Sequence, residues 1–265
     1  MQKQNLIVLT LLNLSILVVV TMTLLTQSYT VTPPKTDMIR SDSTPTPLVI
    51  NEPIATIEPI ESETSQPSEQ VHYEIDTNNT LFIGDSRTIG LMEYGGNATI
   101  DYFADVGMSL YKMDDYILPI NDIGKVSLEQ LLSQHSYQTI FIMLGINDLG
   151  YNYQSLCTKF FELVTNIQQN QPEAKIILVK NLHLTASRSD SDPTFNNTNI
   201  NNLNDYIATL ANNDTIYCID TNTYYDDQYG NLSSEYSNDN THLYAKYYTQ
   251  WLQQILDSAS LAINQ

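Results

Sequence analysis

Short apolar runs alternate with helical segments over the C-terminal part of the chain. The apolar runs, such as "TLFIGD" and "TIFIMLG", cover residues 80–85, 99–105, 139–145, 175–180 and 215–220. They are almost continuous, which is typical of strands covered on both faces of a parallel sheet. The segments between them predict helices over 86–94, 108–116, 127–134, 154–169 and 196–211, and a last helix starting near Thr241. The alternation predicts an α/β fold, a three-layer α/β/α sandwich around a central, mostly parallel five-stranded sheet.

The N-terminal pattern is different, because residues 5–26 contain no charged side chain. A helix of this length crosses the hydrocarbon core of a bilayer. Residues 1–4, which include Lys3, form a short tail that we expect on the cytoplasmic side. The run is longer than the core of an ordinary signal peptide and no clear small-x-small site follows it, which favours a transmembrane signal anchor over a cleaved signal peptide. Under either interpretation the rest of the chain is exported.

Residues 27–77 are rich in Pro, Ser, Thr and Glu and poor in aromatic residues. Such a composition cannot bury enough apolar area to offset the entropy of the chain. We therefore predict a disordered stalk over 27–77 and a folded domain over 78–265.

The charge balance limits the partners of this domain. The net charge is −19 and the pI is near 4.2, which argues against nucleic acid, whose phosphates require basic patches. The two cysteines, Cys157 and Cys218, lack a metal-type spacing. We expect free thiols, although the sequence leaves a disulfide open. No metal-binding cluster and no phosphate-binding loop is present in the sequence, so we expect no metal and no cofactor.

Four short blocks lie at the ends of predicted strands or before the last helix: "GDS" at 84–86, Gly107, "GIND" at 145–148 and "DNTH" at 239–242. The carboxyl ends of parallel strands form the usual ligand site of such folds. In this order the blocks resemble the SGNH hydrolase superfamily, the GDSL-type esterases and lipases, from about residue 80 to the C-terminus. The resemblance implies a flavodoxin-like sheet and a serine esterase.

The chemistry of three residues agrees with that resemblance. A serine hydroxyl is a weak nucleophile unless a base activates it, and His242 is the candidate base for Ser86. Asp239 lies three residues before His242, close enough to bind the other imidazole nitrogen and fix its tautomer. The alternative is structural: Ser86 would cap a helix, and Asp239 and His242 would belong to a polar loop.

The resemblance also implies an oxyanion hole with three donors, the backbone N–H groups of Ser86 and Gly107 and the side-chain amide of Asn147. Preset donors of this kind stabilise the negative oxygen of the transition state. The alternative for Gly107 and Asn147 is an ordinary turn residue. We expect Asp148 to hold its loop.

Four further residues are candidates for substrate binding: Asp85, Arg87, Tyr151 and His183. Arg87 departs from the family pattern, which usually has a small or apolar residue after the nucleophile. It would anchor an anionic or sugar group or pair with Asp105 or Asp148, and the pairing is slightly favoured. For Asp85 and His183 local hydrogen bonding is the favoured alternative.

Together these features predict an extracytoplasmic serine esterase on a bacterial cell membrane. The stretches "EYGGNAT", "DLGYNYQ" and "SRSDSDPTFNNTN" flank the blocks and are polar, with Tyr and Asn. Such a rim suits sugar hydroxyls better than long alkyl chains, which favours short acyl esters, above all O-acetyl groups on carbohydrate. The alternatives are an acyltransferase with the same residues, a lipase or lysophospholipase, and a non-catalytic module that binds a glycan or a partner protein.

Overall fold

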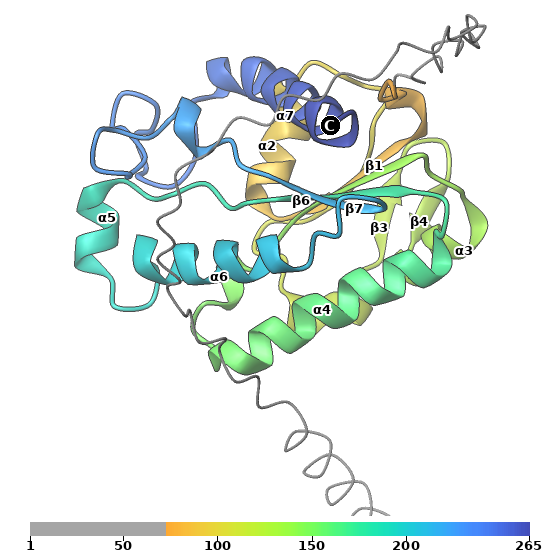
Figure 1. Ribbon diagram of the computed structural model, residues 1–265, viewed down its shortest axis with the longest axis horizontal. Helices are drawn as coiled ribbons and strands as arrows, with labels where there is room; N and C mark the ends of the chain where they lie inside the picture. The colour runs from red at the N-terminus through yellow and green to blue at the C-terminus, as the bar shows by residue number, and fades with distance from the viewer. Residues whose placement is uncertain (1–72) are drawn as a thin grey trace, which may run out of the picture. The chain divides into compact units, whose positions relative to one another are not determined.

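The computed structural model describes residues 73–265 (Figure 1). The predicted tail of residues 1–4, the apolar run of 5–26 and residues 27–72 of the predicted stalk lie outside this range. Within it, no helix combines the length and the apolar character needed to span a membrane.

A five-stranded sheet forms the middle layer of the domain. Its strands are β1 (Thr80–Gly84), β2 (Asp101–Ala104), β5 (Thr139–Met143), β6 (Lys175–Val179) and β7 (Ile216–Ile219). Their order is β2-β1-β5-β6-β7, and every neighbouring pair is parallel. All five coincide with the apolar runs of the sequence, so the predicted parallel sheet is confirmed.

Helices cover both faces of the sheet, as predicted (Figure 1). The helices α2 (Ser86–Tyr94) and α7 (Tyr248–Ile263) lie on one face, and α3 (Leu128–Gln134), α4 (Tyr153–Asn170) and α6 (Asn197–Thr209) lie on the other. Alternate strand residues feed the two cores, because successive side chains of a strand point to opposite faces. Leu81 and Ile83 therefore pack with α4 and α6, whereas Phe82 packs with α2 and α7.

One predicted helix is wrong. Residues 108–116 form the 3₁₀ helix η2 (Leu110–Asp115), which is kinked at Lys112. The backbone N–H of Leu110 donates to the Asp148 carboxylate at 2.9 Å. This long-range acceptor holds the start of the segment, and the non-helical backbone of Lys112, with a φ of −119°, interrupts it.

The last helix begins at Tyr248, not near Thr241. The backbone explains the difference, because Asn240 has a positive φ of 69° and Tyr244 is extended, with a ψ of 144°. Neither conformation belongs to a helix, and Asp239 Oδ1 holds the turn by accepting hydrogen bonds from the backbone N–H groups of Thr241 and His242 at 2.9 and 2.8 Å. The 3₁₀ helix η5 (Ala245–Tyr247) then leads into α7.

Several small elements were not predicted. The strands β3 (Leu118–Ile120) and β4 (Gly124–Val126) form an antiparallel hairpin beside β2, and α5 (Ala186–Ser191) follows β6. Three further 3₁₀ helices are η1 (Thr77–Asn79), η3 (Ile146–Asp148) and η4 (Asn222–Tyr224). All are too short for their periodicity to stand out in the sequence.

The described part of the predicted stalk is bound to the domain. The Tyr73 hydroxyl donates to the Gln138 carbonyl oxygen at 3.0 Å and lies 2.9 Å from Thr139 Oγ1. The backbone N–H of Tyr73 donates to Asn264 Oδ1 at 2.8 Å. Residues 73–77 thus join the start of the domain to its C-terminal helix.

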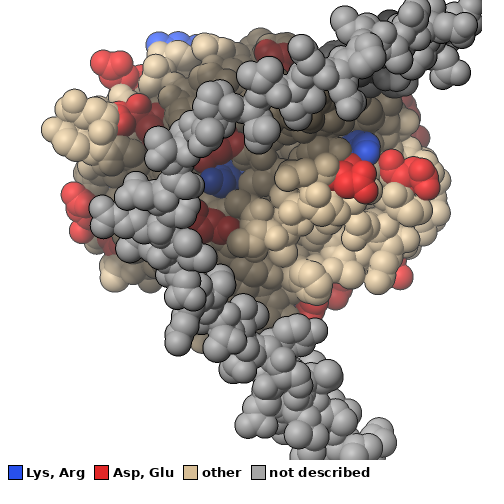
Figure 2. Space-filling view, viewed as in Figure 1, with Lys and Arg blue, Asp and Glu red and all other residues tan. Residues whose placement is uncertain are grey.

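The thiols and the surface agree with the composition. Cys157 and Cys218 are both free, as predicted, and burial raises the pKa of Cys218 to about 11. Figure 2 shows acidic side chains spread over the visible face of the domain, with only scattered basic ones among them.

Candidate active site

The turn after β1 carries the predicted nucleophile. Asp85 is the N-cap of α2, and its carboxylate accepts a hydrogen bond from the backbone N–H of Arg87 at 3.0 Å. Ser86 is the first residue of the helix, so Asp85 and not Ser86 has the capping role. The N–H of Ser86 is one of the first-turn donors that a helix leaves without an intrahelical acceptor. An oxyanion donor needs that property.

Ser86, His242 and Asp239 form a continuous chain of hydrogen bonds. Oγ of Ser86 lies 2.8 Å from Nε2 of His242, and Nδ1 of His242 lies 2.7 Å from Oδ2 of Asp239. A carboxylate beside Nδ1 favours the tautomer protonated there, so Nε2 faces Ser86 as an acceptor. The geometry is that of a nucleophile, a general base and an orienting carboxylate.

Asp239 is an unusually strong acid. Burial would raise the pKa of its carboxyl, but hydrogen bonds from the His242 backbone, the His242 ring and the Thr241 backbone outweigh it and lower the pKa to about 2. The carboxylate is therefore ionised at neutral pH. In that form it can orient the imidazole and stabilise an imidazolium.

The loop that carries Asp239 and His242 is fixed from outside. The backbone N–H of Thr185 donates to the Asn240 carbonyl oxygen at 3.1 Å, and Thr185 Oγ1 bonds Asn240 Oδ1 at 2.8 Å. Asn240 has a positive φ of 69°, a conformation that asparagine tolerates better than most residues. The segment after β6 thus holds the turn before His242.

Asn147 and Gly107 come from neighbouring strand ends. The Asn147 side-chain amide donates to the Met108 carbonyl oxygen at 3.1 Å, which ties the loop after β5 to the loop after β2. Gly107 has a φ of 73° and is exposed, and no atom lies within 4 Å of the Cβ that a larger residue would add. The backbone conformation, not a lack of space, therefore requires glycine at this position.

Asp148 holds this loop pair together, as expected. Its carboxylate accepts hydrogen bonds from Ser109 Oγ at 2.5 Å and from the Leu110 backbone N–H at 2.9 Å. Burial raises the pKa of Asp148, although both hydrogen bonds oppose the rise. Asp148 is fully buried, which gives it a structural role behind Asn147.

Arg87 forms neither of the ion pairs predicted for it. Its guanidinium is buried, with 1% of the residue exposed, and Nη2 donates to the Thr241 carbonyl oxygen at 3.3 Å. The acid that interacts with it most strongly is Asp85, not Asp105 or Asp148. Asp85 is also fully buried and caps α2, so it does not reach a substrate.

A small cavity of about 180 Å³ lies beside Ser86 and His242. Its lining includes Ser86, Arg87, Asn147, Thr241 and His242, and adds four residues that the sequence analysis did not single out: Ile146, Leu184, Arg188 and Phe195. Arg188 and Phe195 lie in the polar stretch that was expected at the rim. Ile146 and Leu184 follow strand ends, a position that the apolar pattern does reveal.

Of the four predicted substrate-binding residues only Arg87 lines this cavity; Asp85, His183 and Tyr151 do not. His183 is buried, and its ring nitrogens lie 2.8 Å from Asp226 Oδ2 and 2.7 Å from Asn201 Oδ1. Burial lowers the pKa of His183, but these hydrogen bonds outweigh it and the net pKa is raised. His183 is therefore a structural link between segments. Tyr151 is 52% exposed and stacks on Tyr111 with ring centroids 4.0 Å apart, on the loops that follow Asn147 and Gly107.

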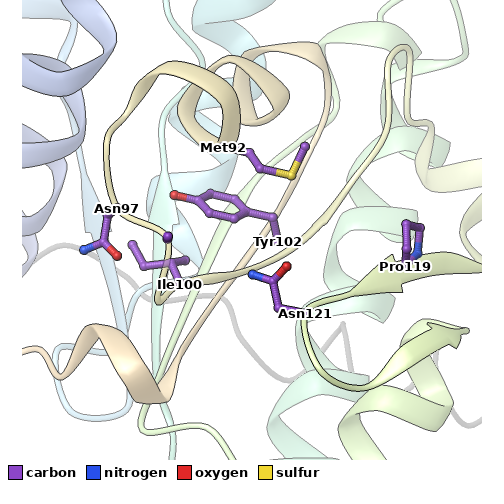
Figure 3. Close-up of a pocket in the computed structure, with 7 residues that line it drawn as sticks. Met92, Asn97, Ile100, Tyr102, Pro119 and Asn121 are labelled. Atoms are coloured by element: carbon purple, nitrogen blue, oxygen red, sulfur yellow. The ribbon is translucent and has the colours of Figure 1, made fainter.

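A second cavity of about 230 Å³ lies elsewhere on the domain (Figure 3). Neutral side chains line it: Met92, Asn97, Ala98, Ile100, Tyr102, Pro119 and Asn121. None of them is a candidate nucleophile with a base beside it, so its larger volume does not make it the active site. Within residues 73–265 no group of three or more His, Cys, Asp or Glu side chains is placed to hold a metal ion.

Comparisons with known proteins agree with this geometry. The model of the GDSL-like Lipase/Acylhydrolase family matches residues 82–250. No curated protein sequence matches the chain.

Three solved structures are similar in fold. A Streptococcus pneumoniae protein described as a platelet activating factor is 21% identical, with a TM-score of 0.51, over 71% of this chain and 86% of that one. A Bacteroides fragilis protein described as an acylhydrolase is 16% identical, with a TM-score of 0.52, over 72% and 92%. A GDSL-like lipase from Bacteroides thetaiotaomicron is 17% identical, with a TM-score of 0.51, over 69% and 89%.

Proposed function

Because the chain belongs to the GDSL-like lipase/acylhydrolase (SGNH) family of serine ester hydrolases, we propose that it hydrolyses short acyl esters, most simply O-acetyl esters of carbohydrate. The observation that carries this proposal is the unbroken hydrogen-bond chain from Ser86 through His242 to Asp239. It joins the three residues that a serine hydrolase needs, although Ser86 and His242 are 156 residues apart in sequence.

The reaction takes place in two steps. Ser86 Oγ attacks the ester carbonyl while His242 Nε2 takes its proton, and the imidazolium then protonates the departing alcohol. Water attacks the resulting acyl-enzyme with His242 again as base, which releases the acid and regenerates Ser86. In both steps the N–H groups of Ser86 and Gly107 and the Asn147 amide would stabilise the oxyanion.

The size of the cavity supports a short acyl group. Its volume of about 180 Å³ is below the range of about 300–1,000 Å³ that is usual for drug-sized ligands. Ile146, Leu184 and Phe195 form its apolar wall. A long alkyl chain gains about 0.8 kcal/mol per CH₂ only where such a wall continues.

The rim supports a sugar as the alcohol. Tyr151 and Tyr153 are about half exposed beside the loop of Asn147, and Tyr111 stacks on Tyr151. Exposed aromatic faces next to polar groups suit a sugar ring, which has both an apolar face and hydroxyl groups. The alcohol side of the ester would leave the cavity over this rim.

The N-terminal sequence supports an extracytoplasmic location. The uncharged run of residues 5–26 is long enough to anchor the chain in a membrane, with the esterase domain outside the cytoplasm of a bacterial cell. Protease protection of the full-length chain in membrane vesicles would test this orientation.

The esterase proposal is tested with a fluorophosphonate probe and a series of nitrophenyl esters. We expect the probe to label the wild type and not Ser86→Ala, and we expect the highest kcat/KM for the acetyl or propionyl ester. Since the proposed oxyanion donors are backbone and amide groups, EDTA should leave the rate unchanged. A folded Ser86→Ala variant that retains most of the activity would refute the nucleophile, and a maximum at long chains would indicate a lipase.

A further inference from the structure

Arg87 is the most unusual residue of the site, because it places an ionised guanidinium in the interior directly after the nucleophile. Only 1% of the residue is exposed, and its Nε and Nη1 atoms have no hydrogen-bond partner among the described residues. Burying a charge with unpaired donors is costly. The opposite charge of the buried Asp85 carboxylate offsets part of this cost, and the guanidinium also forms a hydrogen bond to another segment of the chain.

That bond is made to the residue before the general base. Nη2 of Arg87 donates to the carbonyl oxygen of Thr241 at 3.3 Å. The same peptide unit carries the N–H of His242, which donates to Oδ1 of Asp239 at 2.8 Å. The peptide between Thr241 and His242 is therefore held at both its carbonyl oxygen and its N–H. Its orientation determines the position and direction from which the His242 side chain extends.

Regular secondary structure does not provide this constraint. Between η4, which ends at Tyr224, and η5, which begins at Ala245, the chain forms only one isolated bridge, from Asp226 to Leu232. Individual hydrogen bonds hold the loop instead, among them those between Thr185 and Asn240. Arg87 supplies such a bond from the first turn of α2, the turn that also carries Ser86.

We infer that Arg87 is a positioning residue: its guanidinium holds the Thr241–His242 peptide so that the imidazole stays within hydrogen-bond reach of Ser86. One turn of helix thus carries the nucleophile and also the guanidinium that holds Thr241, the residue before the base, 154 residues further along the chain. The inference rests on the proposed esterase function and assigns no substrate contact to Arg87.

The test compares Arg87→Met and Arg87→Lys with the wild type on nitrophenyl acetate. Methionine fills similar space but removes both the charge and the donor, and a misplacement of about 1 Å can cost about 10²-fold in rate. We therefore expect kcat to fall by about 10²-fold in Arg87→Met with KM nearly unchanged. Lysine keeps a charged donor without the planar fork, so Arg87→Lys should recover part of the lost kcat.

A matched control separates positioning from stability. Gln171 is also buried, and its side-chain amide bonds the carbonyl oxygens of Leu132 and His135 at 2.6 and 2.7 Å. It lies just after α4, at the opposite end of the sheet from the triad. Gln171→Met should lower the thermal midpoint without changing kcat at temperatures where the protein is folded.

The possible outcomes are distinct. If Arg87→Met is folded and its kcat is within twofold of the wild type, the inference is wrong while the esterase function stands. If Arg87→Met does not fold, Arg87→Lys provides the test. Positioning predicts that its kcat is below that of the wild type and that the ¹H signal of the His242 Nδ1–H is shifted. If both equal the wild-type values, the inference is wrong. If the wild type neither labels with fluorophosphonate nor hydrolyses esters, the proposed function itself fails.

Discussion

Replacing Asn147 with alanine removes the only side-chain donor of the proposed oxyanion hole. One amide hydrogen of Asn147 is bonded to the Met108 carbonyl oxygen at 3.1 Å, and this bond leaves the other free to donate. Asn147 lines the cavity together with Ser86 and His242. Loss of one such donor typically costs about 10²–10³ in kcat, or about 2.7–4 kcal/mol of transition-state stabilisation. KM should change little, because the donor acts mainly on the transition state.

The structural cost of the same change is smaller. Asn147→Ala leaves the Met108 carbonyl oxygen without this donor, and the net loss for a hydrogen bond is about 1 kcal/mol. A domain with about 5–15 kcal/mol of stability tolerates that loss. Asn147→Asp keeps the shape but replaces a donor by a negatively charged acceptor. The new carboxylate would repel both the Met108 carbonyl oxygen and the developing oxyanion, so kcat should fall at least as far as in the alanine variant.

The assay measures kcat and KM separately with nitrophenyl acetate at a temperature well below the unfolding midpoint of each variant. Asn121→Ala is the matched control, because it removes an asparagine from the second cavity and should leave both constants unchanged. If only KM rises in Asn147→Ala, this residue binds the ground state and the oxyanion argument fails. If Asn121→Ala lowers kcat as much, the assignment of catalysis to the smaller cavity is wrong.

Three further predictions concern stability, the rim and the N-terminal boundary. Hydrogen bonding raises the pKa of His183 despite its burial. The ion pair of His183 with Asp226 therefore stabilises the fold fully below about pH 6.5, the ordinary pKa of histidine. This stabilisation is lost as the pH rises through the raised pKa of His183. The difference in thermal midpoint between the wild type and Asp226→Asn should therefore shrink from about pH 5 to pH 9, and a constant difference would contradict this. Tyr151→Ala should lower kcat/KM several-fold on acetylated xylan but not on nitrophenyl acetate. Tyr229 is an exposed tyrosine elsewhere, so Tyr229→Ala should change kcat/KM on neither substrate. Equal losses on both substrates in Tyr151→Ala would exclude a sugar contact. A chain beginning at residue 78 should be active but melt at a lower temperature than one beginning at Tyr73, because it lacks the bonds of Tyr73 to Gln138 and Asn264; equal midpoints would show that residues 73–77 contribute nothing.

The sequence by itself determined the layers of this domain and the edge at which its chemistry lies. Each strand is a near-continuous apolar run, and the two central runs Thr80–Gly84 and Thr139–Met143 are buried at every position. Parallel strands bring their carboxyl ends to one edge, so the positions of Ser86 and Asn147 after β1 and β5 already predicted that they would meet. The order of the four blocks and their chemistry then indicated the esterase family. This information is local, since it depends on periodicity and on residue type at strand ends.

Only the tertiary structure decided which partners the polar residues find. Arg87 bonds Thr241 and not Asp105 or Asp148, and His183 bonds Asp226 and Asn201 in place of a substrate. The late start of α7 has a similar origin, because Thr185 bonds Asn240, whose positive φ of 69° does not fit a helix. A hydrogen bond between segments 154 residues apart leaves no periodic trace in either segment. Its geometry is set by the packing of the sheet and helices that bring the two segments together, and that packing exists only in the folded chain.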